Sequence, residues 1–307
     1  MATKTPTPTP TAKPLLPLKG VRIVSLALNL PGPAALMRCQ RMGATCIKLE
    51  PPPHPSAPKD TSGDPMGLYN PKAYATLHQG MRIAQVDLKS DKGQKALHRE
   101  LAKADVLLTS FRPSALAKLG LEWKSLQKLY PTLSLVAIFG APGERAEEPG
   151  HDLTYLAENQ LVNGLDLPPT LYADMGGSLM ASEAVLKARL LQLQKGKGVR
   201  LDIALSDAAA YLALPRTWCL TTPGAAVGGG HSGYRVYPCK DGRVAVAALE
   251  PHFAAALGGV VGLKASNIMA MFAPESHVAI AAFLLTQTRK QLDALAVEKD
   301  IPLHTLA

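Results

Sequence analysis

From Gly20 onward, the sequence alternates short apolar runs with segments of helical pattern. The run "VRIVSLAL" is rich in β-branched residues, a Pro/Gly turn follows, "ALMRCQRMG" has a helical pattern with a closing glycine, and "ATCIKLE" is a second apolar run. The same order returns after the proline-rich stretch 51–60 and continues to "LSLVAIFG". This alternation predicts βαβ units in a mostly parallel sheet with right-handed crossovers. Ligands of such sheets bind beyond the carboxyl ends of the strands.

Two domains and a short tail are expected from the 307 residues. Residues 1–17 begin with alternating Thr and Pro and are expected to be disordered. Residues 18–215 are expected to form a large α/β domain. Residues 216–307 are expected to form a small α+β domain.

Three further elements are predicted in the second half of the chain. A long helix should begin near Asp174, run to about Gln194 and stop at "KGKG". Two alternating apolar runs around Lys240-Asp241-Gly242 predict a β-hairpin. The segment from Glu250 onward has a helical pattern.

Composition excludes several classes of protein. Apolar residues make up 47% and charged residues 19%, which fits a globular chain and not a disordered one. No apolar run approaches the roughly 18 residues of a membrane-spanning helix, so no membrane partner is expected. The net charge of +9 suggests an anionic ligand, but basic and aromatic residues do not alternate, so nucleic acid is not the expected partner.

The cysteines give no sign of a metal site or a disulfide framework. The four cysteines form no CxxC pair and no His/Cys ligand spacing, so no metal is expected. Reduced thiols and the lack of an apolar leader indicate a cytoplasmic protein. The motifs GxxxxGK[ST], HExxH and GxSxG are missing.

Two titratable residues stand out, each at the junction of a glycine-containing loop and a predicted helix start. They are His151 in "EEPGHDLTYLA" and Asp174 in "TLYADMGGSLMAS". Helix N-termini stabilise developing anions, although a helix cap for Asp174 and a surface loop for His151 are the more common roles. A G-x-G-x-x-G pattern also occurs at Gly228, Gly230 and Gly233, but a strand and not a helix should follow it, so a dinucleotide site is not indicated.

Several ordered motifs resemble the class III CoA-transferase family of the CaiB/BaiF type, and within it the α-methylacyl-CoA racemases. They include "LKGVRIVSLALNLPGPAALMRCQRMGATCIKLEPP", "QVDLKSDKGQKAL", "ADVLLTSFRPSALAKLGL", "PGHDLTYLA", "LYADMGGSLMA" and "DGRVAVAALEPHF", within residues 18–305. The resemblance implies an α/β fold with a Rossmann-like large domain, a smaller α+β domain and an interlocked homodimer. It also implies an acyl-CoA substrate and no prosthetic group.

The resemblance implies two different roles for Asp174. In the transferase members the matching aspartate is a nucleophile. In the racemase members this aspartate and a histidine at the position of His151 lie on opposite faces of the substrate's α-carbon, where one removes a proton and the other returns it. An aromatic residue often stands at the histidine position in transferases, so His151 favours the racemase. Glu250 matches a glutamate near the racemase site, although it could equally be a helix-start carboxylate.

The resemblance also implies contacts with coenzyme A. Lys89 and Arg112 could meet phosphates or could be solvated surface cations. Pro51 stands where the racemases have a basic residue, and the segment that returns to the large domain is expected to be short. A non-catalytic acyl-CoA-binding protein therefore stays open beside the racemase and the transferase. The implied CoA-contacting residues are Val86, Asp87, Leu88, Lys89, Arg112, Gly150, Asp152 and Tyr155.

Overall fold

The computed structural model describes residues 15–56, 58, 61–264 and 267–307. The Thr/Pro-rich stretch 1–14 of the predicted tail lies outside the described residues. Leu16 takes part in a turn, because its carbonyl accepts a hydrogen bond from Lys19 N–H. The chain divides into two compact units, and the boundary in the sequence falls between Leu212 and Ala213.

The first unit is built on a six-stranded sheet in which every pair of neighbouring strands is parallel. The order is β3-β2-β1-β4-β5-β6, which confirms the predicted α/β fold. The central strands β4 and β5 are buried along their whole length, as expected for strands covered on both faces. The strands are β1 (Arg22–Ser25), β2 (Thr45–Glu50), β3 (Arg82–Gln85), β4 (Val106–Thr109), β5 (Ser134–Phe139) and β6 (Arg200–Ala204).

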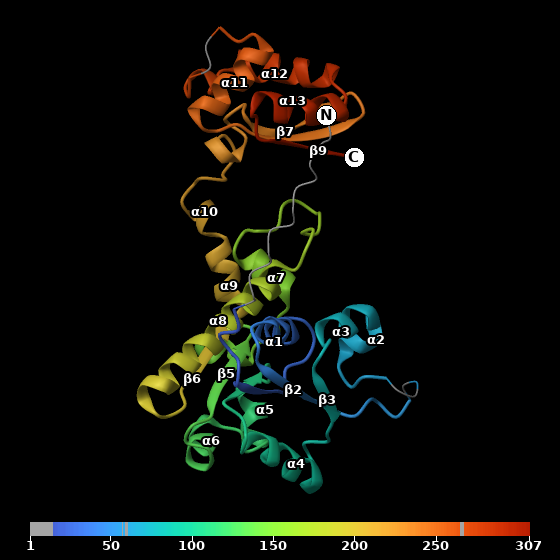
Figure 1. The fold of residues 1–307 in the computed structure, drawn as a ribbon, viewed down its shortest axis with the longest axis vertical. Helices are drawn as coiled ribbons and strands as arrows, with labels where there is room; N and C mark the ends of the chain where they lie inside the picture. Colours follow the sequence, from blue (N-terminus) through green and yellow to red (C-terminus); the bar gives the residue numbers. More distant parts are fainter. Residues whose placement is uncertain (1–14, 57, 59–60, 265–266) are drawn as a thin grey trace, which may run out of the picture. The chain divides into compact units, whose positions relative to one another are not determined.

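Helices cover both faces of this sheet (Figure 1). One core joins α1, α8 and α9 to side chains such as Ile23 and Val136, while the other joins α4, α5 and α6 to the neighbouring Val24 and Leu135. The side chains of successive strand residues therefore pack into the cores on opposite faces of the sheet, because side chains alternate along a strand. The helices are α1 (Pro31–Arg41), α2 (Pro65–Tyr69), α3 (Pro71–Leu77), α4 (Asp91–Leu101), α5 (Pro113–Lys118), α6 (Trp123–Leu129), η1 (Gly143–Glu147), α7 (Asp152–Glu158), α8 (Tyr172–Lys195) and α9 (Leu205–Leu212).

The strand order reverses between β1 and β4. From β1 the chain proceeds through β2 to β3 on one side, and from β4 it proceeds through β5 to β6 on the other. The loops that leave β1 and β4 therefore diverge, which opens a crevice at the carboxyl edge of the sheet. The long helix α8 begins two residues before the predicted start at Asp174 and ends at Gly196, whose φ of 66° closes it in the left-handed conformation.

The second unit contains a three-stranded antiparallel sheet with the order β7-β8-β9. The predicted hairpin is confirmed, because Cys239 and Gly242 pair at the end that the turn connects. The helical pattern predicted from Glu250 onward is wrong at its end, where β9 pairs with β8 over residues of weak strand preference. The elements are α10 (Leu214–Thr217), η2 (Ala226–Gly228), β7 (Tyr234–Cys239), β8 (Gly242–Ala247), α11 (Pro251–Val261), η3 (Ala270–Phe272), α12 (Pro274–Thr286), α13 (Arg289–Lys299) and β9 (Leu303–Leu306).

The glycine pattern before β7 and the end of β3 were also considered in the sequence. The glycine pattern from Gly228 to Gly233 leads into β7, so the helix that a dinucleotide site requires does not follow it. The alternation that returns after the stretch 51–60 begins with the apolar run "RIAQVDL", and of this run only Arg82–Gln85 is strand. Among the described residues, no helix combines the length and apolar character needed to cross a membrane.

The close packing of α1 against the chain that follows β1 gives a test of the fold. A Cβ atom at Gly32 would overlap the side chain of Ala27. We expect Gly32→Ala to lower the free energy of unfolding by about 1–3 kcal/mol, because the core has no room for the methyl group. Urea unfolding followed by circular dichroism measures this change. Arg41→Ala, at the exposed end of the same helix, is the control and should shift stability by less than about 0.5 kcal/mol. If Gly32→Ala and Arg41→Ala unfold at the same urea concentration, this packing is contradicted.

Candidate active site

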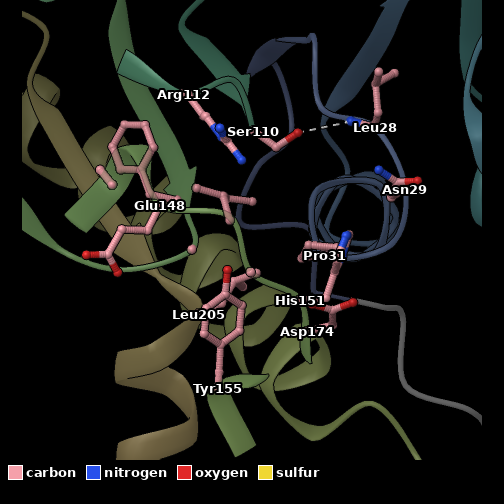
Figure 2. A pocket seen from close by; sticks show the side chains of 15 residues that line it. Leu28, Asn29, Pro31, Ser110, Arg112, Glu148, His151, Tyr155, Asp174 and Leu205 are labelled. Carbon is pink, nitrogen blue, oxygen red and sulfur yellow. Dashed lines mark hydrogen bonds between the residues drawn. The ribbon is translucent and has the colours of Figure 1, made fainter. Parts of the chain in front are cut away.

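A pocket of about 170 Å³ lies at the carboxyl edge of the parallel sheet (Figure 2). The loop after β1 contributes Leu28 and Asn29, and the loop after β4 contributes Ser110 and Arg112. Leu28 N–H donates a hydrogen bond to Ser110 Oγ at 3.2 Å, so the two diverging loops are joined across the reversal of strand order. The pocket therefore occupies the place where ligands of parallel α/β sheets bind.

His151 lines this pocket from the N-terminal end of α7. It is the N-cap residue, and the Thr154 hydroxyl accepts a hydrogen bond from His151 N–H and donates one to its carbonyl. His151 is exposed, so its ring is accessible to a ligand in the pocket.

Asp174 lines the same pocket from the first turn of α8. Asp152, which is buried, accepts a hydrogen bond from Asp174 N–H at 3.0 Å and so fixes the start of α8. Burial and the nearby charge of Asp152 raise the pKa of Asp174 to about 6, although the charge of His151 opposes this shift. The side chains of His151 and Asp174 are drawn together at one end of the pocket in Figure 2. Near pH 6 the carboxyl can both accept and donate a proton.

Tyr155 forms part of the pocket wall, and two glycines allow its close approach. A Cβ atom at Gly140 or Gly150 would collide with the Tyr155 ring or its hydroxyl. Burial raises the pKa of the Tyr155 phenol, so the hydroxyl keeps its proton near neutral pH. Both Gly150 and Tyr155 were expected to contact coenzyme A, and both line the pocket.

Arg112 reaches the pocket from the end opposite to His151 in Figure 2. It is the N-cap residue of α5 and is exposed. Within the part of the chain that the structure describes, its guanidinium makes no ion pair. This arrangement leaves a cation available to an anionic ligand.

The four residues Val86 to Lys89 follow β3 at the same edge of the sheet but do not line this pocket. Val86 N–H donates to the Glu50 carbonyl, and Asp87 Oδ1 accepts a hydrogen bond from Lys89 N–H at 3.0 Å. Gly93 lets α4 approach this turn, since a Cβ atom there would overlap the Asp87 carbonyl. Asp87 and Lys89 are exposed, so their side chains are accessible to a ligand along this edge.

Glu250 belongs to the second unit, where it is the N-cap residue of α11. Its side chain is exposed and makes no capping hydrogen bond. No group of three or more His, Cys, Asp or Glu side chains within the described residues is placed to hold a metal ion.

The sequence analysis missed the contributions of Asn29, Ser110 and Glu148 to the pocket. Asn29 and Ser110 follow the two strands at which the order of the sheet reverses. Their positions just after apolar runs were a usable signal, but which strand ends meet depends on the strand order. Glu148 lies in a loop after η1, and nothing local in the sequence marks it.

Comparison with known proteins assigns the chain to a family. Residues 18–307 match the profile of CoA-transferase family III. The chain belongs to CoA-transferase family III. This confirms the resemblance seen in the sequence.

Relatives in CoA-transferase family III include both isomerases and transferases. The chain is 30% identical to α-methylacyl-CoA racemase of Homo sapiens over 269 residues, which are 82% of this chain and 66% of that protein. It is 31% identical to cinnamoyl-CoA:phenyllactate CoA-transferase of Clostridium sporogenes over 210 residues, which are 62% of this chain and 50% of that protein. The chain therefore spans about half to two thirds of the length of these relatives.

The fold of CoA-transferase family III is also seen in solved structures. The crystal structure of a CAIB/BAIF family protein from Brucella suis superposes with a TM-score of 0.75 at 22% identity. The match covers 96% of this chain and 85% of that chain. The chain therefore belongs by sequence to a family that includes both racemases and CoA-transferases, and it has the fold of a CAIB/BAIF family structure.

The raised pKa of Asp174 predicts a pH-dependent effect on stability. Because the folded-state pKa of about 6 lies above the ordinary pKa of 3.8 for an aspartate in the unfolded chain, folding favours the protonated carboxyl. The resulting penalty is absent below about pH 4, grows as the pH rises through 6 and is largest above it. We expect Asp174→Asn to raise the free energy of unfolding by up to about 3 kcal/mol at pH 8 and to change it little at pH 4.

Urea unfolding at the two pH values measures this effect, with the exposed Asp166→Asn as the control. If Asp174→Asn raises the free energy of unfolding equally at both pH values, the pKa of the carboxyl is not raised in the folded protein.

Proposed function

We propose that the protein interconverts the two configurations at the α-carbon of a 2-methylacyl-CoA by 1,1-proton transfer. The observation that carries this proposal is the presence of His151 and Asp174 in one pocket, each at the start of a helix. One group removes the α-proton to give an enolate, and the other returns a proton to the opposite face. Such a reaction needs two acid/base groups that work near neutral pH, and the pKa of Asp174, raised to about 6, meets that need.

The surroundings of this pair suit an enolate intermediate. The 24-residue helix α8 directs its N-terminal, positive end toward the side of the pocket where Asp174 lies. Negative charge that develops on the thioester oxygen is favoured near such a helix end. The 30% identity to the human racemase supports the same assignment.

The coenzyme A portion is proposed to follow the carboxyl edge of the sheet. Arg112 would pair with a phosphate through its free guanidinium, and Lys89 would meet another beyond β3. The pocket residues Gly150 and Tyr155 would contact the thioester end, whereas Asp152 acts by holding α8 in place. Val86, Asp87 and Leu88 would present the turn between β3 and α4 to the nucleotide. Glu250 is proposed to take part in the same reaction, which the rate of α-deuteration in Glu250→Gln tests.

A CoA-transferase is the second candidate, because the Clostridium transferase is 31% identical to this chain, although over 210 residues instead of the 269 that match the racemase. The carboxylate oxygens of Asp174 accept no hydrogen bond from other described residues, so they are free to attack the thioester carbonyl. The C–S bond would break, CoA thiolate would leave and an acyl anhydride would form on Asp174. His151 would then be incidental. A non-catalytic acyl-CoA-binding protein is the third outcome that an assay can reveal.

Isotope exchange distinguishes these functions. The protein is incubated with a 2-methylacyl-CoA in heavy water, and deuterium at the α-carbon is followed by mass spectrometry. We expect the wild type to incorporate deuterium, and both His151→Ala and Asp174→Ala to lose at least about 100-fold of the rate, in line with the loss of a general acid/base.

Transferase activity would give a different pattern. The transferase is supported if Asp174→Ala loses activity, His151→Ala keeps it and an enzyme–CoA adduct can be trapped. Binding of the thioester without exchange or transfer would leave the non-catalytic role.

We also propose that the protein is a homodimer, built on an apolar stripe along α8. Exposed side chains recur on one side of this helix at Met175, Leu179, Leu190 and Leu193. Beside them lies a largely apolar groove of about 650 Å³ that α9 completes with Tyr211 and Leu212. Exposed apolar surface of this extent is typical of protein interfaces, and a second copy, interlocked with the first, is the proposed occupant.

Analytical ultracentrifugation tests the dimer. We expect the wild type to sediment as a dimer and Leu190→Glu to weaken self-association at least about tenfold, because a carboxylate would be buried without a partner. Lys124→Glu, on α6 at the other face of the sheet, should leave the dimer intact. A monomeric wild type, or equal effects of the two variants, would contradict the proposed interface.

A further inference from the structure

A buried cluster of charged side chains lies beside the pocket, at the end of β2. Lys48 on β2 has no exposed surface, and its Nζ lies 2.5 Å from Asp64 Oδ2 and 3.5 Å from Glu50 Oε2. His78 Nε2 is 2.9 Å from the same Nζ. Because the ammonium only donates, His78 Nε2 accepts, and the protonated Nδ1 donates to the Tyr74 carbonyl. Two hydrogen bonds, to Asp64 and His78, and an ion pair with Glu50 therefore fix the position of the Lys48 ammonium.

Asp64 connects this cluster to the pocket wall. Both of its carboxylate oxygens accept the backbone N–H of Asn29, at 3.1 and 3.2 Å. One oxygen also accepts Met66 N–H at 3.0 Å and caps α2. A single buried carboxylate thus ties β2, the start of α2 and the loop between β1 and α1 together.

Asn29 is held in a conformation that needs such support. Its φ is 62°, in the left-handed region that residues other than glycine seldom adopt. Asn29 lines the pocket, and its neighbour Leu28 is bonded to Ser110 on the other side of the crevice. Strained residues of this kind persist where the surrounding structure over-determines them, commonly at functional sites.

Stability alone is a weak reason to bury this ion pair. Removing two charges from water costs about as much as their attraction returns, and apolar replacements are often neutral or stabilising. What Lys48 and Asp64 supply, and apolar side chains could not, is a pair of directed acceptors for Asn29 N–H. We propose that Asp64, clamped by Lys48, is a positioning residue that holds Asn29 and the pocket wall in the geometry needed for turnover. This rests on the proposed function, since turnover means proton exchange at the α-carbon.

The double variant Lys48→Met/Asp64→Leu tests the proposal, because it removes the Lys48–Asp64 ion pair and the acceptors of Asn29 N–H together and leaves the net charge of the cluster unchanged. Glu50, the buried carboxylate that remains, keeps its hydrogen bonds from Ser62, Gly63 and Tyr74. Tyr74→Phe is the matched control: it removes the hydrogen bond from Tyr74 to Glu50 in the same cluster and leaves the bonds to Asn29 intact. We expect the double variant to exchange the Asn29 amide hydrogen at least about tenfold faster. Its kcat for α-deuteration should fall about 10- to 100-fold with KM within about twofold, since small displacements of reacting groups cost this much.

Tyr74→Phe should leave both the amide exchange and kcat close to wild type. The proposal is overturned if the Asn29 amide of the double variant exchanges at the wild-type rate. It is also overturned if kcat falls as much in Tyr74→Phe as in the double variant.

A second pair of variants leaves the buried cluster untouched and serves if the double variant does not fold. Asn29→Gly and Asn29→Ala both remove the side chain, but only glycine adopts a positive φ without strain. We expect Asn29→Gly to keep the higher kcat by several-fold, and the reverse order contradicts the proposal.

Failure of the proposed function has a separate signature. If the wild type does not deuterate the α-carbon, that function is wrong. Amide exchange at Asn29 then decides the positioning role, which predicts faster exchange of this amide in the double variant than in the wild type. An unchanged exchange rate rejects it.

Discussion

The reversal of strand order between β1 and β4 is the constraint on which the site depends. The chain leaves these neighbouring strands in opposite directions, so no crossover connection fills the space above them. The hydrogen bond from Leu28 N–H to Ser110 Oγ joins the two loops and fixes the width of the crevice. His151 and Asp174 come from later in the chain, and they reach this crevice because α7 and α8 begin at its edge.

Several charged side chains of the first unit hold the geometry of the site and lower the stability of the fold. Asp174 is half-buried next to Asp152, which raises its pKa, although Asp152 is needed to hold the start of α8. Lys48 and Asp64 are fully buried, and Asp64 accepts the backbone N–H groups of Asn29 and Met66. The two apolar cores on either side of the sheet supply the stability that these buried charges do not.

Much of this architecture could be predicted from local sequence, and the exceptions have physical causes. The strands before Asn29 and Arg112 were evident from their β-branched runs, and the hairpin from Lys240-Asp241-Gly242. The helices α2 and α3 were not predicted, although Asp64 and Asn70 each precede a proline and cap a helix. Strand β9 depends on pairing with β8. The burial of Lys48 is set by partners from distant segments, so the sequence alone could not show it.

The proposed reaction requires a thioester α-carbon between His151 and Asp174, at the crevice between β1 and β4. A crystal structure of Asp174→Asn with a bound 2-methylacyl-CoA shows whether it lies there. We expect the α-carbon in contact with both side chains, on opposite faces, with the nucleotide along the carboxyl edge of the sheet. A thioester bound away from His151, or contacted by both groups on the same face, would contradict it.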